Sequence, residues 1–277
     1  EQAIIRLSYV DTLTGLNNRR KHQEQLVKLD QEKYHPISVV FFDINGLKVM
    51  NDAFGHSQGD KLIKLVANKL LISCDQHKSY VSRVGGDEFI VLCPNTTENE
   101  AIELANEAKN MIEKEYLNHV KISISYGVST KDMRNNFEDI INLAETNLYK
   151  NKLYESSSHR NESIRAILNT LKAKDEYSEE HSKRVSNICT KMGQKLGMTK
   201  QDINLLTLIS HLHDIGKIAI ADNILNKPGK LTDEEWTIMK RHPETGYRIL
   251  SSSPDYIEIA KDILFHHERY DGKGYPS

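Results

Sequence analysis

The chain has 277 residues, a length typical of two domains, and its 38% hydrophobic and 27% charged residues are ordinary for a folded protein. This composition excludes collagen-like, low-complexity and largely disordered chains. The 37 basic and 39 acidic side chains give a formal net charge of −2, without the basic excess of proteins that bind nucleic acids through phosphates. We therefore expect no nucleic-acid partner.

The cysteines and the lengths of the apolar runs indicate the compartment in which the protein is expected. Cys74, Cys93 and Cys189 are odd in number and far apart, which favours reduced thiols in a cytoplasmic protein over a disulfide framework. No apolar run reaches the ~18 residues that cross a bilayer, so no membrane span is predicted. The chain begins with Glu1 and without a signal-peptide pattern, which indicates a piece of a longer protein with room for an upstream sensor domain.

Up to about residue 153 the sequence alternates between strand-like and helix-like patterns. Gly85-Gly86 separates two strand-like runs, which is typical of a hairpin. The expected strands span residues 37–43, 80–84, 89–92 and 120–128, and the expected helices lie around 62–70 and over 101–116 and 137–153. This order predicts an α/β or α+β domain around one central, mostly antiparallel sheet.

The sequence pattern changes at three serines, residues 156–158, and no strand-like pattern is found after them. Gly197 stands where a glycine ends a helix, and Thr232 begins a capping box. Trp236 and Met239 are predicted on the inner, core side of the helix that follows. The expected helices span residues 180–196, 199–214, 257–267 and a segment from 232. We therefore predict an α/β domain over residues 1–155 and an all-α domain over 160–277.

Carboxylates are predicted to converge at one edge of the sheet. Asp43 ends the first hydrophobic strand, and Asp87 and Glu88 directly follow Gly85-Gly86. Hard oxygen ligands of this kind suit Mg²⁺, which also binds substrate phosphates. The glycines let backbone N–H groups approach a phosphate. Taken alone, the hairpin is equally compatible with a tight turn that carries solvated acids.

The surrounding segments resemble the GGDEF family of diguanylate cyclases. The matching segments are DTLTGLNNRR (11–20), FDINGLK (42–48), NDAFGH (51–56) with Gly59-Asp60, RVGGDEF (83–89), SYGV (125–128) and NLY (147–149). The resemblance implies a cyclase-type sheet that binds one GTP per domain and joins two GTP into cyclic di-GMP. Two domains must then face each other, so a homodimer is expected.

The resemblance also implies a role for each residue of the GTP site. Asp43, the carbonyl of Ile44 and Asp87 would hold Mg²⁺, and Asp87 or Glu88 would assist deprotonation of the attacking 3′-hydroxyl. The expected GTP contacts are Asn51 and Asp60 with guanine, Lys48 and Lys152 with the triphosphate, and His56, Gly85 and Gly86 within the same site. Such groups position GTP and neutralise its charge, which is most of what phosphoryl transfer requires.

Several positions depart from the GGDEF pattern. Asn45 replaces a second aspartate, and Ser156 replaces the arginine of the final "GRN" element. Gln76 and Ser79 stand where the RxxD motif of product inhibition would be, so no feedback is expected there. The principal expectation is catalysis, and the alternative is a GTP-binding module that regulates the second domain.

The second half carries a set of histidines around one aspartate. His213-Asp214 ends an amphipathic helix, with Lys217 three residues on, and the further members are His181, His242, His266 and His267. Imidazoles and one carboxylate suit a pair of transition metals, which can activate water and clamp a phosphodiester. Lys217 would stabilise charge on the phosphate oxygens. A single histidine is more typical of the surface or core, as we predict for His22 at the surface, but five beside an aspartate favour a metal site.

These residues resemble the HD-GYP family of cyclic di-GMP phosphodiesterases. The matching segments are HSKRV (181–185), LHDIGK (212–217), ILNKPGKLT (224–232), HPETG (242–246) and HHERYDGKGYP (266–276). The resemblance implies hydrolysis of cyclic di-GMP to the linear dinucleotide and GMP, with Asp214 and Lys217 catalytic and Tyr275 at the substrate. One metal would bind His181, His213 and Asp214, and another Asp214, His242, His266 and His267; Fe or Mn is expected.

Two features modify this second expectation. Tyr177 stands where members with a third metal carry glutamate, so a two-metal site is expected. A further aspartate ligand and helices of the family would follow Ser277, so the phosphodiesterase half of this segment is expected to be impaired. The alternative for this half is hydrolysis of another nucleotide. Together the two halves predict an enzyme of cyclic di-GMP turnover that both makes and degrades its product.

Overall fold

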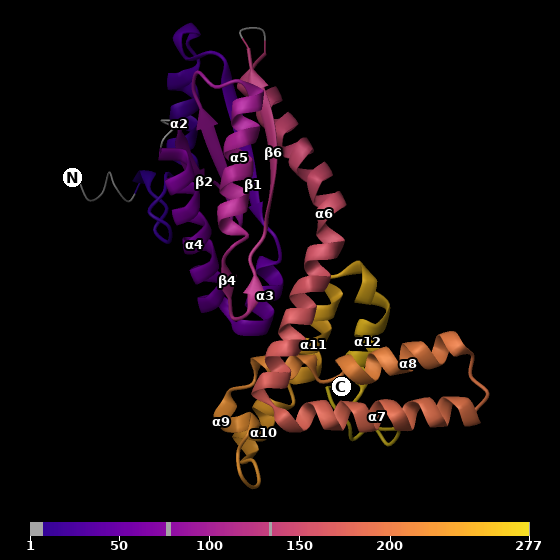
Figure 1. The fold of residues 1–277 in the computed structure, drawn as a ribbon. Helices are drawn as coiled ribbons and strands as arrows, with labels where there is room; N and C mark the ends of the chain where they lie inside the picture. Colours follow the sequence, from indigo (N-terminus) through magenta and orange to yellow (C-terminus); the bar gives the residue numbers. More distant parts are fainter. Residues whose placement is uncertain (1–7, 76–78, 133–134, 277) are drawn as a thin grey trace. The chain divides into compact units, whose positions relative to one another are not determined.

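The computed structural model describes residues 8–75, 79–132 and 135–276, of which 75, 153–161 and 176–179 are described by their backbone alone (Figure 1). The chain forms two compact units. The first is built from residues 1–47, 58–117 and 121–159, and the second from residues 48–57, 118–120 and 160–277. Among the described helices, none combines the length and apolar character needed to cross a membrane.

A four-stranded antiparallel sheet forms the centre of the first unit. Its strands are β1 (Ile37–Ile44), β2 (Tyr80–Arg83), β3 (Glu88–Cys93) and β6 (Ile124–Lys131), in the order β2-β3-β1-β6. All eight residues of β1 are buried, and because side chains alternate between the faces of a strand, both faces must be covered. The predicted hairpin and the mostly antiparallel sheet are confirmed.

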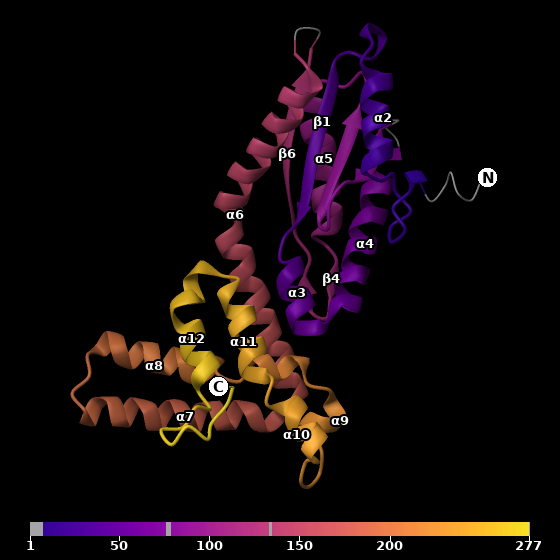
Figure 2. The same ribbon diagram turned by 180° about the vertical axis from the view of Figure 1, so that it is seen from behind.

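Helices cover the two faces of this sheet. The covering helices are α2 (Arg19–Leu29), α4 (His56–Asp75), α5 (Glu98–Ile112) and the first part of α6 (Phe137–Lys174). Leu29 of α2 and Leu148 of α6 pack with Val39 and Phe41 of β1 in one cluster, on the face seen in Figure 2. Helix α5 lies on the opposite face, where it contacts β6 and β1 (Figure 1).

Close backbone contact explains two of the sequence motifs in this unit. A Cβ atom on Gly127 of β6 would overlap the carbonyl oxygen of Ala144 and the backbone nitrogen of Leu148 on α6. The side chain of Asn147 donates a hydrogen bond of 3.0 Å to the carbonyl of Val128. The SYGV and NLY segments are therefore the two sides of one strand–helix contact.

Two expectations about the first half are wrong in detail. The strand expected at 120–128 is divided into β5 (Val120–Lys121), which pairs with β4 (Tyr116–Leu117), and β6 in the main sheet. The helix expected to reach residue 116 ends at Ile112. Asn118 and His119 both have positive φ, and this turn folds the segment into a short hairpin where the apolar pattern had indicated a longer helix and one strand.

Helix α6 continues without a break through the three serines and ends at Lys174 instead of near 153. Serine is only slightly unfavourable in a helix, so three of them do not by themselves end one. The predicted domain limit at 155–160 falls inside this helix and stays a prediction.

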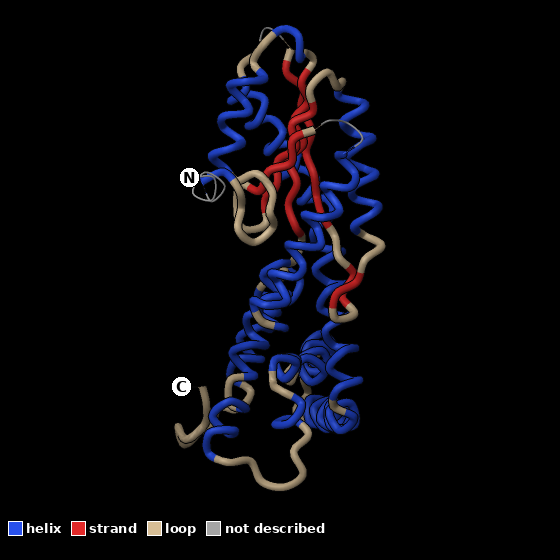
Figure 3. Tube along the Cα trace, turned by 90° about the vertical axis from the view of Figure 1, so that its left-hand side faces the viewer, coloured by secondary structure: helices blue, strands red, loops and turns tan. Residues whose placement is uncertain are grey.

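Residues 160–276, which make up most of the second unit, are helical and contain no strand (Figure 3). Its helices after α6 are α7 (Glu176–Lys195), α8 (Lys200–Leu212), η2 (Ile215–Ala219), α9 (Asp222–Leu225), α10 (Asp233–Met239), α11 (His242–Ser251), η3 (Pro254–Tyr256) and α12 (Ile257–Phe265). A short helix of the same unit, α3 (Leu47–Phe54), precedes α4 in the chain. The all-α expectation for this half is confirmed.

Local signals set the ends of these helices. Gly197 has a φ of +70° and follows α7, and the N–H of Met198 bonds back to the carbonyl of Gly193 at 3.0 Å, as in a glycine-ended helix. At the start of α10, Thr232 and Glu235 form the predicted capping box. The placement of Trp236 in the core is wrong, because its side chain is 44% exposed.

Candidate metal centre and nucleotide site

Three carboxylates meet at one edge of the first unit, and we call Asp43, Asp87 and Glu88 the acidic edge. Asp43 lies opposite Glu88 in the register of β1 and β3. The N–H of Ile44 donates to the carbonyl of Asp87 at 3.1 Å, which joins the strand end to the hairpin. The convergence expected from the sequence is therefore present, and it follows directly from strand pairing.

The acidic edge is electrostatically unfavourable without a cation. The pKa of Asp43 is raised to about 6, mainly by burial; Lys152 lowers it, and the charges of Asp87 and Glu88 add smaller increases. The Lys152 ammonium lies 2.6 Å from Oδ1 of Asp43. A buried carboxylate among like charges is stabilised in its ionised form by a divalent cation with oxygen ligands, so these residues fit Mg²⁺.

The Gly-Gly hairpin is shaped by the residues on either side of it. A Cβ atom on Gly85 would overlap the carboxylate of Glu88, whereas one on Gly86 would meet nothing within 4 Å. Arg83 donates through Nη2 to the carbonyl of Gly86 at 2.7 Å and pairs with Asp11 at 3.1 Å. The sequence reasoning gave no role to Arg83 or Asp11, although both stand in the matching motifs; their ion pair holds the hairpin in place.

Other residues of the expected GTP site are placed less directly. Asp60 is exposed on α4, and residues 48–57, which include Lys48, Asn51 and His56, belong to the second compact unit. Their roles remain predictions. Asn45 donates 3.0 Å hydrogen bonds to the hydroxyls of Ser123 and Ser125, so it joins strand ends. Gln76 and the side chains of Ser156 and Tyr177 lie outside the described residues.

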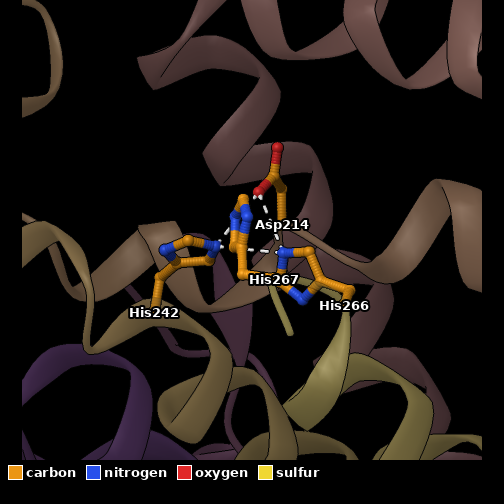
Figure 4. A group of neighbouring side chains, drawn as sticks. All are labelled: Asp214, His242, His266 and His267. Atoms are coloured by element: carbon orange, nitrogen blue, oxygen red, sulfur yellow. Dashed lines mark hydrogen bonds and ion pairs between the residues drawn. The ribbon is translucent and has the colours of Figure 1, made fainter. Parts of the chain in front are cut away.

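Six side chains of the second unit form a second cluster, which we call the histidine cluster. They divide into two groups that share Asp214, and within each group the potential ligand atoms lie within 4.8 Å of one another. The groups are Asp214 with His242, His266 and His267 (Figure 4), and Asp214 with His181 and His213. The residues come from α7, the end of α8, the start of α11 and the end of α12.

The two oxygens of Asp214 face different histidines. Oδ2 lies 3.2 Å from Nε2 of His213 and 2.8 Å from the ammonium of Lys217. Oδ1 lies 3.4 Å from Nε2 of His242 and 4.0 Å from Nε2 of His266. Although burial opposes ionisation, the hydrogen bond and charge of His213 and the charge of Lys217 hold the pKa of Asp214 well below its usual range. Asp214 is therefore an anion placed to bridge two cations.

Backbone carbonyls orient three of the imidazoles. Nδ1 of His213 lies 2.8 Å from the carbonyl of Ser210, Nδ1 of His242 lies 2.9 Å from that of Met239, and Nδ1 of His266 lies 2.6 Å from that of Ile263. In the neutral form of each ring, the nitrogen beside the carbonyl carries the proton, which leaves Nε2, on the side of Asp214, with the electron pair. Burial lowers the pKa of His213, but its hydrogen bond to Asp214 and the charge of that carboxylate raise the pKa overall, so this ring loses its Nε2 proton when it binds a metal. The three carbonyls belong to the last turns of α8, α10 and α12, where a helix has no partner for them.

The charge states of His242 and His266 suit metal binding. Burial is the principal cause that lowers the pKa of His242 and of His266, in each case to about 4. Both rings are therefore neutral near pH 7, which is the form that binds metal ions. Neutral imidazoles, each oriented through Nδ1, together with a bridging carboxylate form a donor set that fits two divalent transition metals.

Two glycines allow the elements of this cluster to approach. A Cβ atom on Gly216 of η2 would overlap the carbonyl oxygen of His242 and lie 2.6 Å from the nitrogen of Gly246. On Gly246, a Cβ atom would lie 3.0 Å from a methyl carbon of Ile263. The glycines of the HDIG and HPETG segments thus bring Asp214 and His242 together.

A cavity adjoins the histidine cluster on the side of the C-terminal loop. Its volume is ≈ 580 Å³, and it is lined by Asp175, Lys217, Leu225, Asn226, Lys227, Pro228, Trp236, Met239, His242, His267 and Tyr275. The Tyr275 ring stacks on His267 with centroids 4.6 Å apart and 21° between planes. A Cβ on Gly274 would lie 2.6 Å from the carbonyl oxygen of His267, so only glycine lets the loop fold back this closely.

Comparisons with known proteins agree with both halves. The profile of the family described as "Diguanylate cyclase, GGDEF domain" matches residues 8–158, and that of the HD domain matches 165–277. The coiled coil and GGDEF domain of DgcB from Caulobacter crescentus, solved with c-di-GMP, has a TM-score of 0.51 at 22% identity, covering 55% of this chain and 84% of that one. This likeness supports the fold of the first unit.

Curated relatives share part of their length with this chain. It is 38% identical over 124 residues to the cyclic di-GMP phosphodiesterase response regulator RpfG of Xanthomonas campestris pv. campestris, covering 44% of this chain and 33% of RpfG. It is 39% identical over 113 residues to the 3′3′-cGAMP-specific phosphodiesterase 2 of Vibrio cholerae, covering 40% of this chain and 22% of that protein. The chain thus spans a third or less of these two relatives.

Proposed function

Because the chain belongs to the GGDEF diguanylate cyclase family and carries an HD domain after that domain, we propose that it acts in cyclic di-GMP turnover. Synthesis is assigned to residues 1–155 and hydrolysis to residues 160–277. The observation that carries the hydrolytic half is Asp214, whose two oxygens face two separate groups of oriented imidazoles.

In the hydrolytic half, the histidine cluster would hold two divalent metals, Fe or Mn, and Asp214 would be a ligand common to both groups of histidines. When bound, such a pair supplies Lewis acidity to the phosphodiester oxygens and to the attacking water. Lys217 contributes positive charge beside the carboxylate, where charge develops on the phosphate. Tyr275 and the adjoining cavity contact the rest of the substrate. The oxygen of water forms a bond to phosphorus, the bond from phosphorus to the 3′-oxygen breaks, a proton from the water passes to that 3′-oxygen, and the linear dinucleotide is released.

The test of this half is metal content and hydrolysis measured together. The chain loaded with Mn²⁺ or Fe²⁺ is expected to bind two metals and to convert cyclic di-GMP to the linear dinucleotide. His242→Ala should lower both readouts, whereas His211→Ala, an exposed histidine outside both groups, should leave them unchanged. Full metal content and full hydrolysis in His242→Ala would reject the assignment.

A second substrate is favoured by the comparison with the Vibrio cholerae enzyme, whose name specifies 3′3′-cGAMP. Cyclic di-GMP is proposed first because the same chain carries a domain of the diguanylate cyclase family. The two substrates differ in one purine base. Values of kcat/KM measured on both with the metal-loaded chain decide between them, and a higher value for 3′3′-cGAMP would replace cyclic di-GMP as the substrate.

In the synthetic half, Asp43, the Ile44 carbonyl and Asp87 would hold Mg²⁺, and Asp87 or Glu88 would accept the proton of the 3′-hydroxyl. Mg²⁺, when bound, neutralises charge on the triphosphate. Lys48 and Lys152 contact the triphosphate, Asn51 and Asp60 contact guanine, and His56, Gly85 and Gly86 complete the site. Two chains dimerise so that their GTP molecules meet. The electrostatic repulsion within the acidic edge supports a cation there.

Conversion of GTP to cyclic di-GMP by the dimeric chain tests the synthetic half. The assignment would be supported if the Glu88→Gln variant keeps its fold but no longer converts GTP to cyclic di-GMP. GTP binding without turnover, even at dimerising concentrations, would instead support a regulatory GTP-binding module, which the replacement of the family arginine by Ser156 favours.

A further inference from the structure

Trp236 is an exposed residue that also lines the cavity beside the histidine cluster. Its side chain is 44% exposed on α10, a helix with no buried residues, yet it lines the same cavity as His242 and His267 of the histidine cluster. Isolated exposed apolar residues are common and need no explanation by themselves. An exposed indole on the wall of a cavity that ends at proposed metal ligands is a more specific arrangement.

The indole ring is also free to accept a planar ligand. Among the described residues, Trp236 makes no aromatic stacking or cation–π contact. Tyr275, the other large aromatic residue of the cavity, is already stacked on His267, and the Lys240 ammonium lies 5.7 Å from the centre of its ring. Of the two rings, Trp236 is therefore the one available for stacking.

The backbone around Trp236 is held in place before any ligand binds. Oε2 of Glu235 accepts hydrogen bonds from the backbone of Thr232 at 2.7 Å and from the ammonium of Lys227 at 2.6 Å. The N–H of Trp236 donates to the carbonyl of Thr232 at 2.8 Å. These contacts fix the first turn of α10 against the preceding loop, so little backbone order has to be gained on binding.

The cavity combines two chemical surfaces. One part carries Lys217, His242 and His267, which suit a phosphate and the metals proposed to bind it. Trp236, Pro228 and Leu225 of the same lining supply apolar surface. Its volume, ≈ 580 Å³, lies within the ~300–1,000 Å³ of small-molecule sites. A ligand with an anionic phosphodiester and a flat aromatic ring fits both surfaces.

We propose that Trp236 stacks against one purine base of the nucleotide whose phosphate lies at the histidine cluster. This inference rests on the proposed hydrolytic function and adds a substrate-binding residue to it. Stacking on an aromatic ring tolerates any base, because every base presents a π-face. Trp236 therefore contributes affinity for a purine and does not discriminate guanine from adenine.

The chain offers a direct probe of this contact, since Trp236 is its only tryptophan. Fluorescence excited at 295 nm is expected to fall in a saturable way when GMP or cyclic di-GMP is added to the metal-loaded full chain. AMP should act like GMP, whereas ribose 5-phosphate and inorganic phosphate should leave the emission unchanged. Equal quenching by ribose 5-phosphate, or no quenching by any purine nucleotide, would overturn the proposal.

Variants give a second measurement. Trp236→Ala should raise the KM for the cyclic dinucleotide about 5- to 150-fold, the factor that corresponds to ~1–3 kcal/mol of base stacking, with little change in kcat. Trp236→Phe should restore most of the affinity, and Ile238→Ala, an exposed apolar residue of the same helix outside the cavity lining, should have no effect. An unchanged KM in Trp236→Ala would overturn the proposal.

The outcomes separate this inference from the proposed function. Hydrolysis and two bound metals without purine-dependent quenching would leave the phosphodiesterase intact and remove Trp236 from its binding site. Purine-dependent quenching in a chain that binds no metal and hydrolyses nothing would keep the stacking contact and reject the hydrolytic role of the histidine cluster.

Discussion

The acidic edge and the histidine cluster are built from different kinds of structure. At the acidic edge, neighbouring antiparallel strands bring Asp43 opposite Glu88, so backbone register alone determines the proximity. In the histidine cluster, the side chains come from α7, α8, α11 and α12, which are far apart in the sequence. Sheet register places carboxylates side by side, whereas imidazoles from separate helices meet only when the whole helical unit has packed.

The two sites also differ in how their charges are balanced. Burial and like charges raise the pKa of Asp43, and only the Lys152 ammonium offsets them. Asp214 is instead surrounded by hydrogen-bond donors and positive charge, which lower its pKa. Like charges thus oppose one another at the acidic edge, while in the histidine cluster backbone carbonyls orient three of the imidazoles.

The largest effects are expected from replacing one aspartate in each site, because each change should abolish only one of the two activities. Asp214→Asn changes the residue that the two histidine groups share, so we expect it to lower hydrolysis at least ~10²-fold and to reduce the bound metal, without affecting synthesis. Asp43→Asn should do the reverse and impair synthesis alone. Metal content and both activities, measured on the full chain, provide the check. Two metals retained by Asp214→Asn would contradict the shared role of this residue.

Two glycine-to-alanine substitutions are expected to change stability by different amounts, one at a close contact between elements and one in the open hairpin. Gly216→Ala places a Cβ atom against the backbone of His242, which cannot move aside, so we expect a loss of stability near the upper end of ~1–3 kcal/mol and weaker metal binding. Gly86→Ala meets no atom within 4 Å and should change stability by less than ~0.5 kcal/mol. Urea unfolding of the two variants measures the difference, and equal stability would contradict the steric argument.

His22, a buried histidine in the first unit, should make the stability of that unit depend on pH. Burial, with a smaller contribution from Arg19, lowers the pKa of His22 to about 4 from its usual 6.5. Between pH 6.5 and 4 the unfolded chain takes up a proton that the folded chain resists, so stability falls by up to about 3 kcal/mol as pH decreases and is unaffected above pH 6.5.

His22→Leu should remove this pH dependence, and His56→Gln, at an exposed position, should keep it. Hydrogen exchange of the β1 amides at pH 7 and pH 4.5 provides the measurement. A first unit that is equally stable at both pH values in the unaltered chain would contradict the expectation.

The smallest expected effect compares matching capping boxes. Thr97 with Glu100 caps α5, and Thr232 with Glu235 caps α10. Each Thr→Ala change should cost ~1 kcal/mol. Because α5 has buried residues and α10 has none, Thr97→Ala should lower the stability of the whole first unit, whereas Thr232→Ala should increase local opening of α10. Hydrogen exchange at the Glu100 and Glu235 amides distinguishes the two, and global destabilisation by Thr232→Ala would refute the contrast.

Features that depend on a few neighbouring residues were predictable. The Gly85-Gly86 hairpin, the helix end at Gly197 and the capping box at Thr232 each follow from chemistry within a span of about four residues, and all three are present. Features that depend on packing were not. The burial of His22 and the exposure of Trp236 reverse the expectations, because each is decided by which other elements cover that position.

For the sites, the amino-acid sequence by itself determined which residue types are present and in what order along the chain. It therefore indicated a carboxylate edge beside the Gly85-Gly86 hairpin and a histidine-rich centre. Only the tertiary structure decided that the two oxygens of Asp214 face different histidines and that carbonyls at three helix ends hold the imidazoles. The physical reason is range, since caps and hairpins arise from neighbours in the chain, while ligand geometry arises from helices that meet only after folding.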